Sequence, residues 1–130
     1  MTFASASQAS AARGHGGGAV PYHWGRYRGI AIGMNQPEPK DLMAENLYFD
    51  TCVYHQPGIN LMTEVVPVDN ILFASELHGA VRCKDPDTGE WFDDTRRYIE
   101  ATPHLTAEEK EKVFYKNALK VFSRLKLPNA

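Results

Sequence analysis

The stretch Leu47-Tyr-Phe-Asp-Thr-Cys-Val-Tyr54, followed by His55-Gln-Pro-Gly58, decides the fold. It is dense in aromatic and β-branched residues, and its apolar residues do not alternate cleanly with polar ones. This composition is typical of a parallel strand that is buried on both faces. A second buried strand is predicted for Asn70-Ile-Leu-Phe-Ala-Ser75, which follows Pro67. The sequence therefore predicts parallel strands over about 47–54 and 70–75.

Helical patterns flank these two strands. Residues 19–34, 57–66 and 93–101 have the composition of helices. Thr106 and Glu109 have the spacing of a capping box, which predicts the start of a last helix. Strands that alternate with helices indicate an α/β fold with a parallel sheet. Because two strands buried on both faces need neighbours, the sequence indicates part of a larger sheet.

Length and charge restrict the class of protein. The chain has 130 residues and a formal net charge of −2, whereas a closed (β/α)8 barrel has about 250 residues. Lys and Arg are scattered, so we expect no binding to nucleic acid. The sequence contains no run of eighteen apolar residues, so it predicts no membrane span. We expect residues 1–14, rich in Ala and Ser, to form a disordered or aberrant tail and residues 15–130 to form the folded part.

The state of the two cysteines and the role of Asp50, which lies in the middle of the first predicted strand, are separate questions. Cys52 and Cys83 lie in no zinc-binding or redox pattern. Two reduced thiols in a cytoplasmic protein are expected, and a single disulfide in a secreted protein is the alternative. Asp50 is interpreted either as a buried, hydrogen-bonded structural acid or as a residue that points into a site. The sequence contains no Gly-x-Ser-x-Gly elbow, phosphate-binding Gly-Lys loop or His-Glu-x-x-His helix.

Candidate functional residues follow the predicted strands, since chemistry in parallel α/β folds collects at the carboxyl ends of strands. Glu76 comes directly after the second strand, where it could ligate a metal or transfer protons, or be a solvated loop residue. Tyr54 and His55 end the first strand, and His55 is equally compatible with a turn. His15 lies among glycines, which either let the backbone approach a ligand closely or form a floppy tail. Arg82 could hold a substrate carboxylate with its planar guanidinium group.

Several segments together resemble one branch of the amidohydrolase superfamily, the aminocarboxymuconate-semialdehyde-decarboxylase-like enzymes. Residues 15–26 (His-Gly-Gly-Gly-Ala-Val-Pro-Tyr-His-Trp-Gly-Arg) are similar to the end of strand six, residues 49–58 to strand seven and residues 67–76 to strand eight. The Ser-Glu that ends the last segment, followed by Gly-Ala-Val-Arg, Asp-Pro-x-Thr-Gly and Phe-Asp-Asp-Thr-x-Arg-Tyr-Ile, resembles the 4-oxalomesaconate hydratase subgroup.

This resemblance implies a (β/α)8 TIM barrel with one divalent metal, usually zinc. It implies a lyase that hydrates 4-oxalomesaconate to 4-carboxy-4-hydroxy-2-oxoadipate in protocatechuate and gallate degradation. It assigns Glu76 to the metal and to catalysis, and His15 to catalysis as the strand-six histidine. Arg82 and His55 would contact the tricarboxylate substrate. The complete enzyme is expected to be a homo-oligomer in the cytoplasm.

The sequence also departs from this family. It lacks the strand-one His-x-His metal pair, so we expect a C-terminal fragment of the barrel that is inactive, and need not hold the metal, by itself. Two alternatives stay open. One is a related decarboxylase or hydrolase that acts on an unsaturated carboxylic acid. The other is a non-catalytic α/β domain that binds a partner through a sheet edge and unfolds cooperatively, whereas the fragment would be molten or aggregated.

Overall fold

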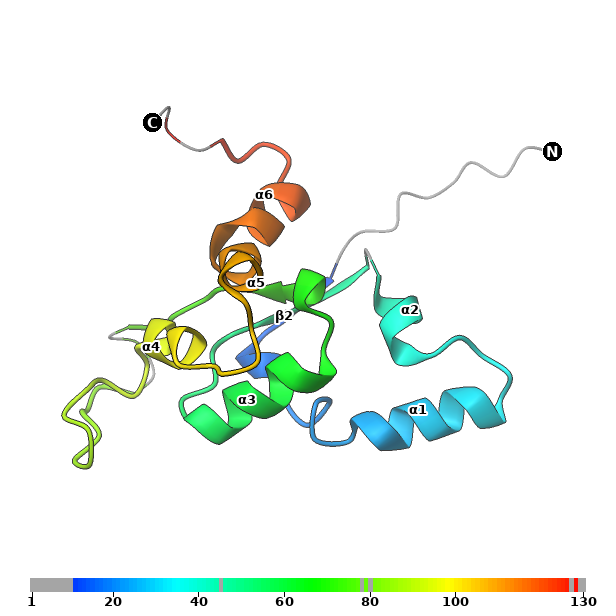
Figure 1. The fold of residues 1–130 in the computed structure, drawn as a ribbon, viewed down its shortest axis with the longest axis horizontal. Helices are drawn as coiled ribbons and strands as arrows, with labels where there is room; N and C mark the ends of the chain where they lie inside the picture. The colour runs from blue at the N-terminus through cyan, green and yellow to red at the C-terminus, as the bar shows by residue number, and fades with distance from the viewer. Residues whose placement is uncertain (1–10, 45, 78, 80, 127, 129–130) are drawn as a thin grey trace.

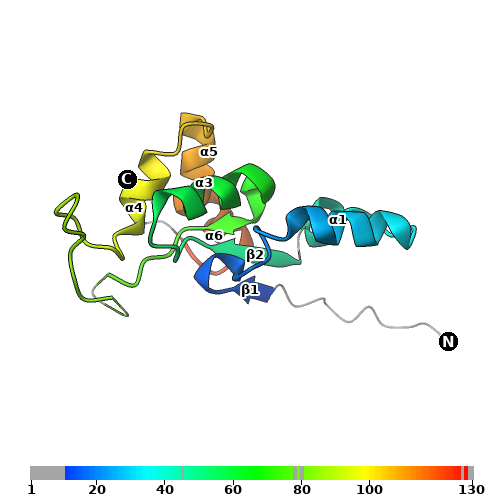
Figure 2. The same cartoon turned by 90° about the horizontal axis from the view of Figure 1, so that it is seen from below.

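A parallel sheet lies at the centre of the computed structural model, which describes residues 11–44, 46–77, 79, 81–126 and 128. Its strands, in the order β1-β2-β3, are Ala11–Arg13, Leu47–Asp50 and Ile71–Leu72 (Figure 1, Figure 2). β2 pairs in parallel with both neighbours. The predicted adjacency and parallel direction of the strands near 47–54 and 70–75 are therefore confirmed.

β2 and β3 are both shorter than the strands that the sequence predicts. β2 has four residues and β3 has two, although the chain continues beyond each. The hydroxyl of Thr51 explains the difference, because it donates to the carbonyl of Ala74 at 2.8 Å and accepts from the Ala74 amide at 2.9 Å. A buried side chain thus joins the two extensions where the backbone ladder stops.

The first strand, β1, lies inside the segment that the sequence predicts to be a disordered or aberrant tail. The sequence predicts this tail over residues 1–14, but residues 11–13 form β1, and Arg13 pairs with Phe49 of β2. Residues 1–10 lie outside the described residues. An Ala-rich segment has little strand propensity of its own, so pairing with the backbone of β2 determines its structure.

Helices follow each strand, close to the predicted positions. The helix expected over 19–34 begins later than expected, after a turn, and the short helix α2 was not predicted. The helices before the C-terminal region are α1 (Trp24–Gly33), α2 (Pro39–Met43), α3 (Gln56–Val65) and α4 (Thr95–Glu100), with 3₁₀ turns η1 (His15–Gly17) and η2 (Val68–Asn70).

The C-terminal helices α5 (Ala107–Glu111) and α6 (Asn117–Val121) are joined by η3, a π-helical turn over Lys112–Lys116. The predicted capping box of Thr106 and Glu109 is confirmed at the start of α5.

These helices bond directly to β3 and the residues beside it. The Phe73 amide donates to the Val113 carbonyl at 2.9 Å, and the Asn117 side chain donates to the carbonyls of Val68 and Ile71, each at 2.8 Å. Backbone groups in and beside β3, the last strand of the sheet, are therefore hydrogen-bonded to the C-terminal helices.

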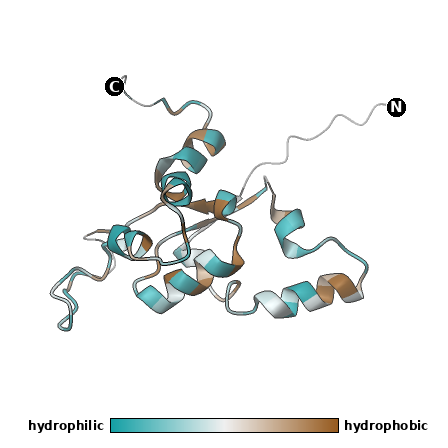
Figure 3. Cartoon of the chain, in the orientation of Figure 1, coloured by the Kyte–Doolittle hydropathy of each residue, from teal (hydrophilic) through white to brown (hydrophobic). Residues whose placement is uncertain are grey.

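The core lies between the sheet, α3, α4 and the C-terminal helices (Figure 1). Its fully buried large apolar side chains are Phe49, Ile59, Met62, Ile71, Ile99, Val66 and Val113. α1 extends away from this body, and its distal half is hydrophobic yet exposed (Figure 2, Figure 3). Within the described part of the chain, none of the helices is both long and apolar enough to cross a bilayer.

Candidate functional site

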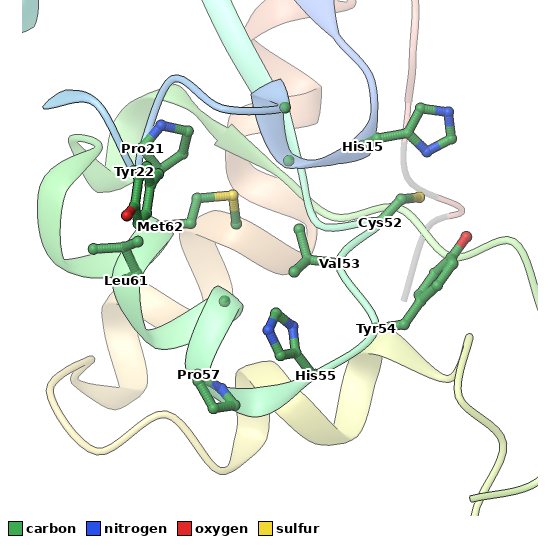
Figure 4. Close-up of a pocket in the computed structure, with 13 residues that line it drawn as sticks. His15, Pro21, Tyr22, Cys52, Val53, Tyr54, His55, Pro57, Leu61 and Met62 are labelled. Atoms are coloured by element: carbon green, nitrogen blue, oxygen red, sulfur yellow. The ribbon is translucent and has the colours of Figure 1, made fainter.

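Three segments meet beyond the carboxyl ends of the parallel strands. They are the glycine-rich turn η1 after β1, the extension 51–55 after β2, and Glu76 after β3. A pocket of about 500 Å³ lies where η1, the β2 extension and the start of α3 meet (Figure 4). Parallel strands place their carboxyl ends at one edge of the sheet, which is why residues far apart in the sequence share this region.

Side chains of the β2 extension alternate between two sides. Cys52 and Tyr54 lie on the same side as His15, whereas Val53 and His55 lie toward α3 (Figure 4). This alternation is that of an extended backbone, in which successive side chains point to opposite faces. Tyr54 therefore lies on the side of β2 where Glu76, which follows β3, can reach it.

Tyr54 and Glu76 form a direct contact between the ends of β2 and β3. The hydroxyl of Tyr54 donates a hydrogen bond to Oε2 of Glu76. Burial, and then the adjacent Glu76 carboxylate, raise the pKa of Tyr54 far above its ordinary value. Tyr54 therefore remains a protonated donor at neutral pH.

The backbone of Tyr54 is also held in place. Its carbonyl accepts a hydrogen bond from the Tyr98 hydroxyl at 2.9 Å, and the Arg97 guanidinium donates to the same hydroxyl at 2.6 Å. Both residues come from α4, so this helix fixes the strand end that carries the donor to Glu76. Tyr98 is buried and its hydroxyl is fully used.

The thiol of Cys52 lies beside this contact. It is buried, and burial together with the nearby Asp50 and Glu76 carboxylates raises the pKa of Cys52 to about 11. A thiol with that pKa is neutral at physiological pH, so Cys52 is a poor nucleophile there. The residue is a small buried neighbour of the candidate site.

Asp50 connects the turn η1 to the β2 extension. Its Oδ1 accepts hydrogen bonds from the amides of Gly16 and Cys52, both at 3.0 Å. Of the two interpretations of Asp50 from sequence, the structure supports the hydrogen-bonded structural acid.

The glycines of η1 contact protein rather than open space. A Cβ on Gly16 would lie 2.2 Å from Val53 Cγ2, and one on Gly17 would lie 2.1 Å from Phe49 Cδ1. Close approach of the turn to the side chains of Val53 and Phe49 therefore accounts for both glycines.

The predicted site residues are only partly brought together. His15 is exposed in η1 and lines the pocket with His55, which lies on its opposite side (Figure 4). Glu76 is linked to the pocket through Tyr54, which also lines it. Arg82 is exposed in the loop after β3, where its Nε donates to the Gly79 carbonyl at 3.3 Å. The assignment of these residues to catalysis, substrate or metal stays a prediction.

The side chains of this region offer few ligands for a metal ion. No three His, Cys, Asp or Glu residues in the described ranges are grouped so that they could hold a metal ion. Glu76 can offer a carboxylate to a metal. A catalytic zinc site needs three protein ligands, so the described residues do not form one by themselves.

Fold and site together define a member of a known family. A model of the amidohydrolase family matches residues 13–124, and the chain belongs to this family. The fold is that of part of an amidohydrolase (β/α)8 barrel, as the sequence predicts.

Two similar proteins share more than half of the aligned residues. One is the 2-keto-4-carboxy-3-hexenedioate hydratase of Sphingobium sp. strain SYK-6, which is 56% identical over 111 residues, or 85% of this chain. The other is the solved structure of the 4-oxalomesaconate hydratase LigJ from Rhodopseudomonas palustris, at 57% identity over 88% of this chain with a TM-score of 0.84. The chain covers 32% of the first relative and 35% of the second, about a third of each.

A more distant structure shares the fold alone. The dihydroxybenzoic acid decarboxylase from Polaromonas sp. JS666, solved with bound manganese, is 18% identical with a TM-score of 0.61. The match covers 91% of this chain and 35% of that protein. The resemblance to the hydratase subgroup that the sequence indicates is therefore confirmed by the two closer relatives.

Proposed function

We propose that this chain forms the part of a 4-oxalomesaconate hydratase that carries Glu76 and His15. The observation that carries the proposal is the contact between Glu76 and Tyr54 at the carboxyl ends of adjacent parallel strands, beside the turn that holds His15. The identity of 56–57% with two hydratases supports it over more than four fifths of the chain.

Hydration of an activated double bond needs a group that takes a proton from water and a group that returns one to carbon. We assign these proton transfers to Glu76 and His15. Tyr54 holds one carboxylate oxygen of Glu76 and leaves the other for the reaction. His55 and Arg82 are assigned to the carboxylates of the substrate, which imidazole and guanidinium groups bind as hydrogen-bond donors.

A divalent metal, which we take to be zinc, would bind at Glu76 together with ligands from outside the described residues. When bound, it would stabilise enolate charge and lower the pKa of water. We place the reaction in the aromatic catabolism of the cytoplasm and expect the complete protein to be a homo-oligomer.

A chimera tests the proposal. Residues 15–125 of this chain replace the corresponding segment of the Rhodopseudomonas palustris hydratase, and hydration of 4-oxalomesaconate is followed by absorbance. We expect turnover, and a loss of about 100-fold or more in the Glu76→Gln chimera, since general acid–base catalysis contributes on this scale. The Glu64→Gln chimera is the matched control, because Glu64 is exposed on α3.

The alternatives predict different results. A folded, metal-containing chimera that releases carbon dioxide instead of hydrating the substrate would favour the decarboxylase. The full chain by itself is assayed in parallel with added zinc, and we expect no turnover and no tight stoichiometric binding. Tight binding of one zinc ion to the unmodified chain would contradict the assignment of the remaining ligands to other residues.

A further inference from the structure

We propose that Asp50 is a positioning residue that orients the Cα–Cβ bond of His15 at the candidate site. The proposal rests on the proposed function in one respect, namely that His15 acts there. Asp50 contacts the segment of His15 rather than its ring, so it acts through the backbone of the turn.

One carboxylate oxygen joins two parts of the site. Oδ1 of Asp50 accepts from the Gly16 amide, directly after His15, and from the Cys52 amide, two residues further along its own strand. Its Oδ2 lies 3.5 Å from where a Cβ of Gly14 would stand. The carboxylate is therefore enclosed by the residues on both sides of His15. This placement follows from the sheet register, because Arg13 pairs with Phe49, the residue before Asp50.

The backbone of His15 needs such support. Its φ of +54° lies in the left-handed region, which residues other than glycine adopt at a cost in free energy. A strained conformation persists only where its surroundings determine it. The hydrogen bond from the next amide to Asp50, together with packing of Gly17 against Phe49, holds the turn in this conformation. Because the φ angle of a residue orients its Cα–Cβ bond, Asp50 also fixes the direction in which the His15 side chain leaves the backbone.

A hydrogen bond to a carboxylate is stronger than one to a neutral acceptor. Asparagine at position 50 would keep an acceptor oxygen, whereas alanine would remove it. The two variants thus separate a hydrogen-bonding role from the volume of the side chain. Asp69 provides a matched control, because it is an exposed aspartate that pairs with Lys112 far from this turn.

The test is amide hydrogen exchange and imidazole NMR of the full chain. In Asp50→Ala we expect exchange of the Gly16 and Cys52 amides to accelerate by about ten- to a hundredfold. The His15 ring signals should move while those of His104 stay in place. Asp50→Asn should restore most of the protection and the His15 signals, and Asp69→Ala should change neither.

Three outcomes would overturn the proposal. The first is unchanged protection of both amides in Asp50→Ala. The second is a loss spread equally over the amides of β2 and β3, which would show a general structural role. The third is an unmodified chain in which both amides are already unprotected. If Asp50→Ala does not fold, Asp50→Asn decides, because loss of both protections despite the retained acceptor would contradict the proposal. None of these measurements depends on turnover, so failure of the hydratase assay and failure of this proposal are distinguishable.

Discussion

Replacing Gly17 with alanine tests whether the glycine run exists to pack the turn η1 against β2. Gly17 has a φ of +76°, and a Cβ there would lie 2.1 Å from Cδ1 and 2.2 Å from Cε1 of Phe49. Phe49 is completely buried in the core, so its ring has no free space into which to move. Both backbone strain and overpacking should therefore destabilise the Gly17→Ala variant.

The expected size follows from these two effects. A non-glycine residue held in a left-handed conformation costs about 1–3 kcal/mol. Overpacking of a well-packed core adds about 1–3 kcal/mol. The free energy of unfolding should thus fall by about 2–6 kcal/mol in Gly17→Ala, which is a large part of the stability of a small domain.

Two other glycines supply the controls. Gly18 also has a positive φ, of +59°, but no described atom lies within 4 Å of its Cβ position, so Gly18→Ala should show the strain alone. Gly29 is equally free of contacts inside α1, and Gly29→Ala should stabilise the chain by about 1 kcal/mol through helix propensity. The assay is urea unfolding of the full chain followed by circular dichroism. The buried core of the described residues predicts a cooperative transition, which would contradict the expectation of a molten or aggregated fragment. The reasoning would be refuted if Gly17→Ala lowered the free energy of unfolding by less than about 1 kcal/mol.

Three further predictions concern single side chains. Asn117→Ala leaves two carbonyls near β3 without their donor and should destabilise the chain by about 1–3 kcal/mol in the same unfolding assay; an unchanged midpoint would contradict the link between the last helix and the sheet. Thr106→Ala removes one half of the capping box and should cost about 1 kcal/mol, with the loss of helical signal confined to the C-terminal helices. Burial and nearby carboxylates raise the pKa of Cys52 to about 11. Alkylation of Cys52 by iodoacetamide at pH 8 should therefore be about tenfold or more slower than alkylation of the exposed Cys83. The rate of Cys52 alkylation should rise with pH up to about 11. Equal rates for the two thiols, measured by mass spectrometry, would contradict the buried, neutral state of Cys52.

Local patterns in the sequence predicted the main elements because their signals are local. The aromatic run after Leu47 marks β2 by composition alone, and the spacing of Thr106 and Glu109 marks a helix start through hydrogen bonds that span three residues. The end of β3 had no such signal. Where its ladder stops is decided by the Thr51 hydroxyl, which bonds to Ala74 across 23 positions of sequence.

β1 could not be predicted for the same reason. An Ala-rich segment becomes a strand only because β2 offers its backbone beside it, so the cause is tertiary. The rule that chemistry follows parallel strands did select Tyr54 and Glu76, which the structure joins by a hydrogen bond. Arg82, which the sequence suggested for its guanidinium group, is exposed, and its Nε donates to the nearby Gly79 carbonyl.

The glycine run shows why a motif and its physical cause have to be separated. The sequence pattern is compatible with close approach of a ligand to His15, and small residues would serve that purpose. The structure places the side chains of Val53 and Phe49 against the Cβ positions of Gly16 and Gly17, and an Asp50 oxygen against the Gly16 amide. Since those contacts already determine the turn without a ligand, the Cα–Cβ bond of His15 is oriented before any substrate binds. A preorganised group loses less conformational freedom on binding than a mobile one, and this is the advantage that the proposed role of Asp50 would give to His15.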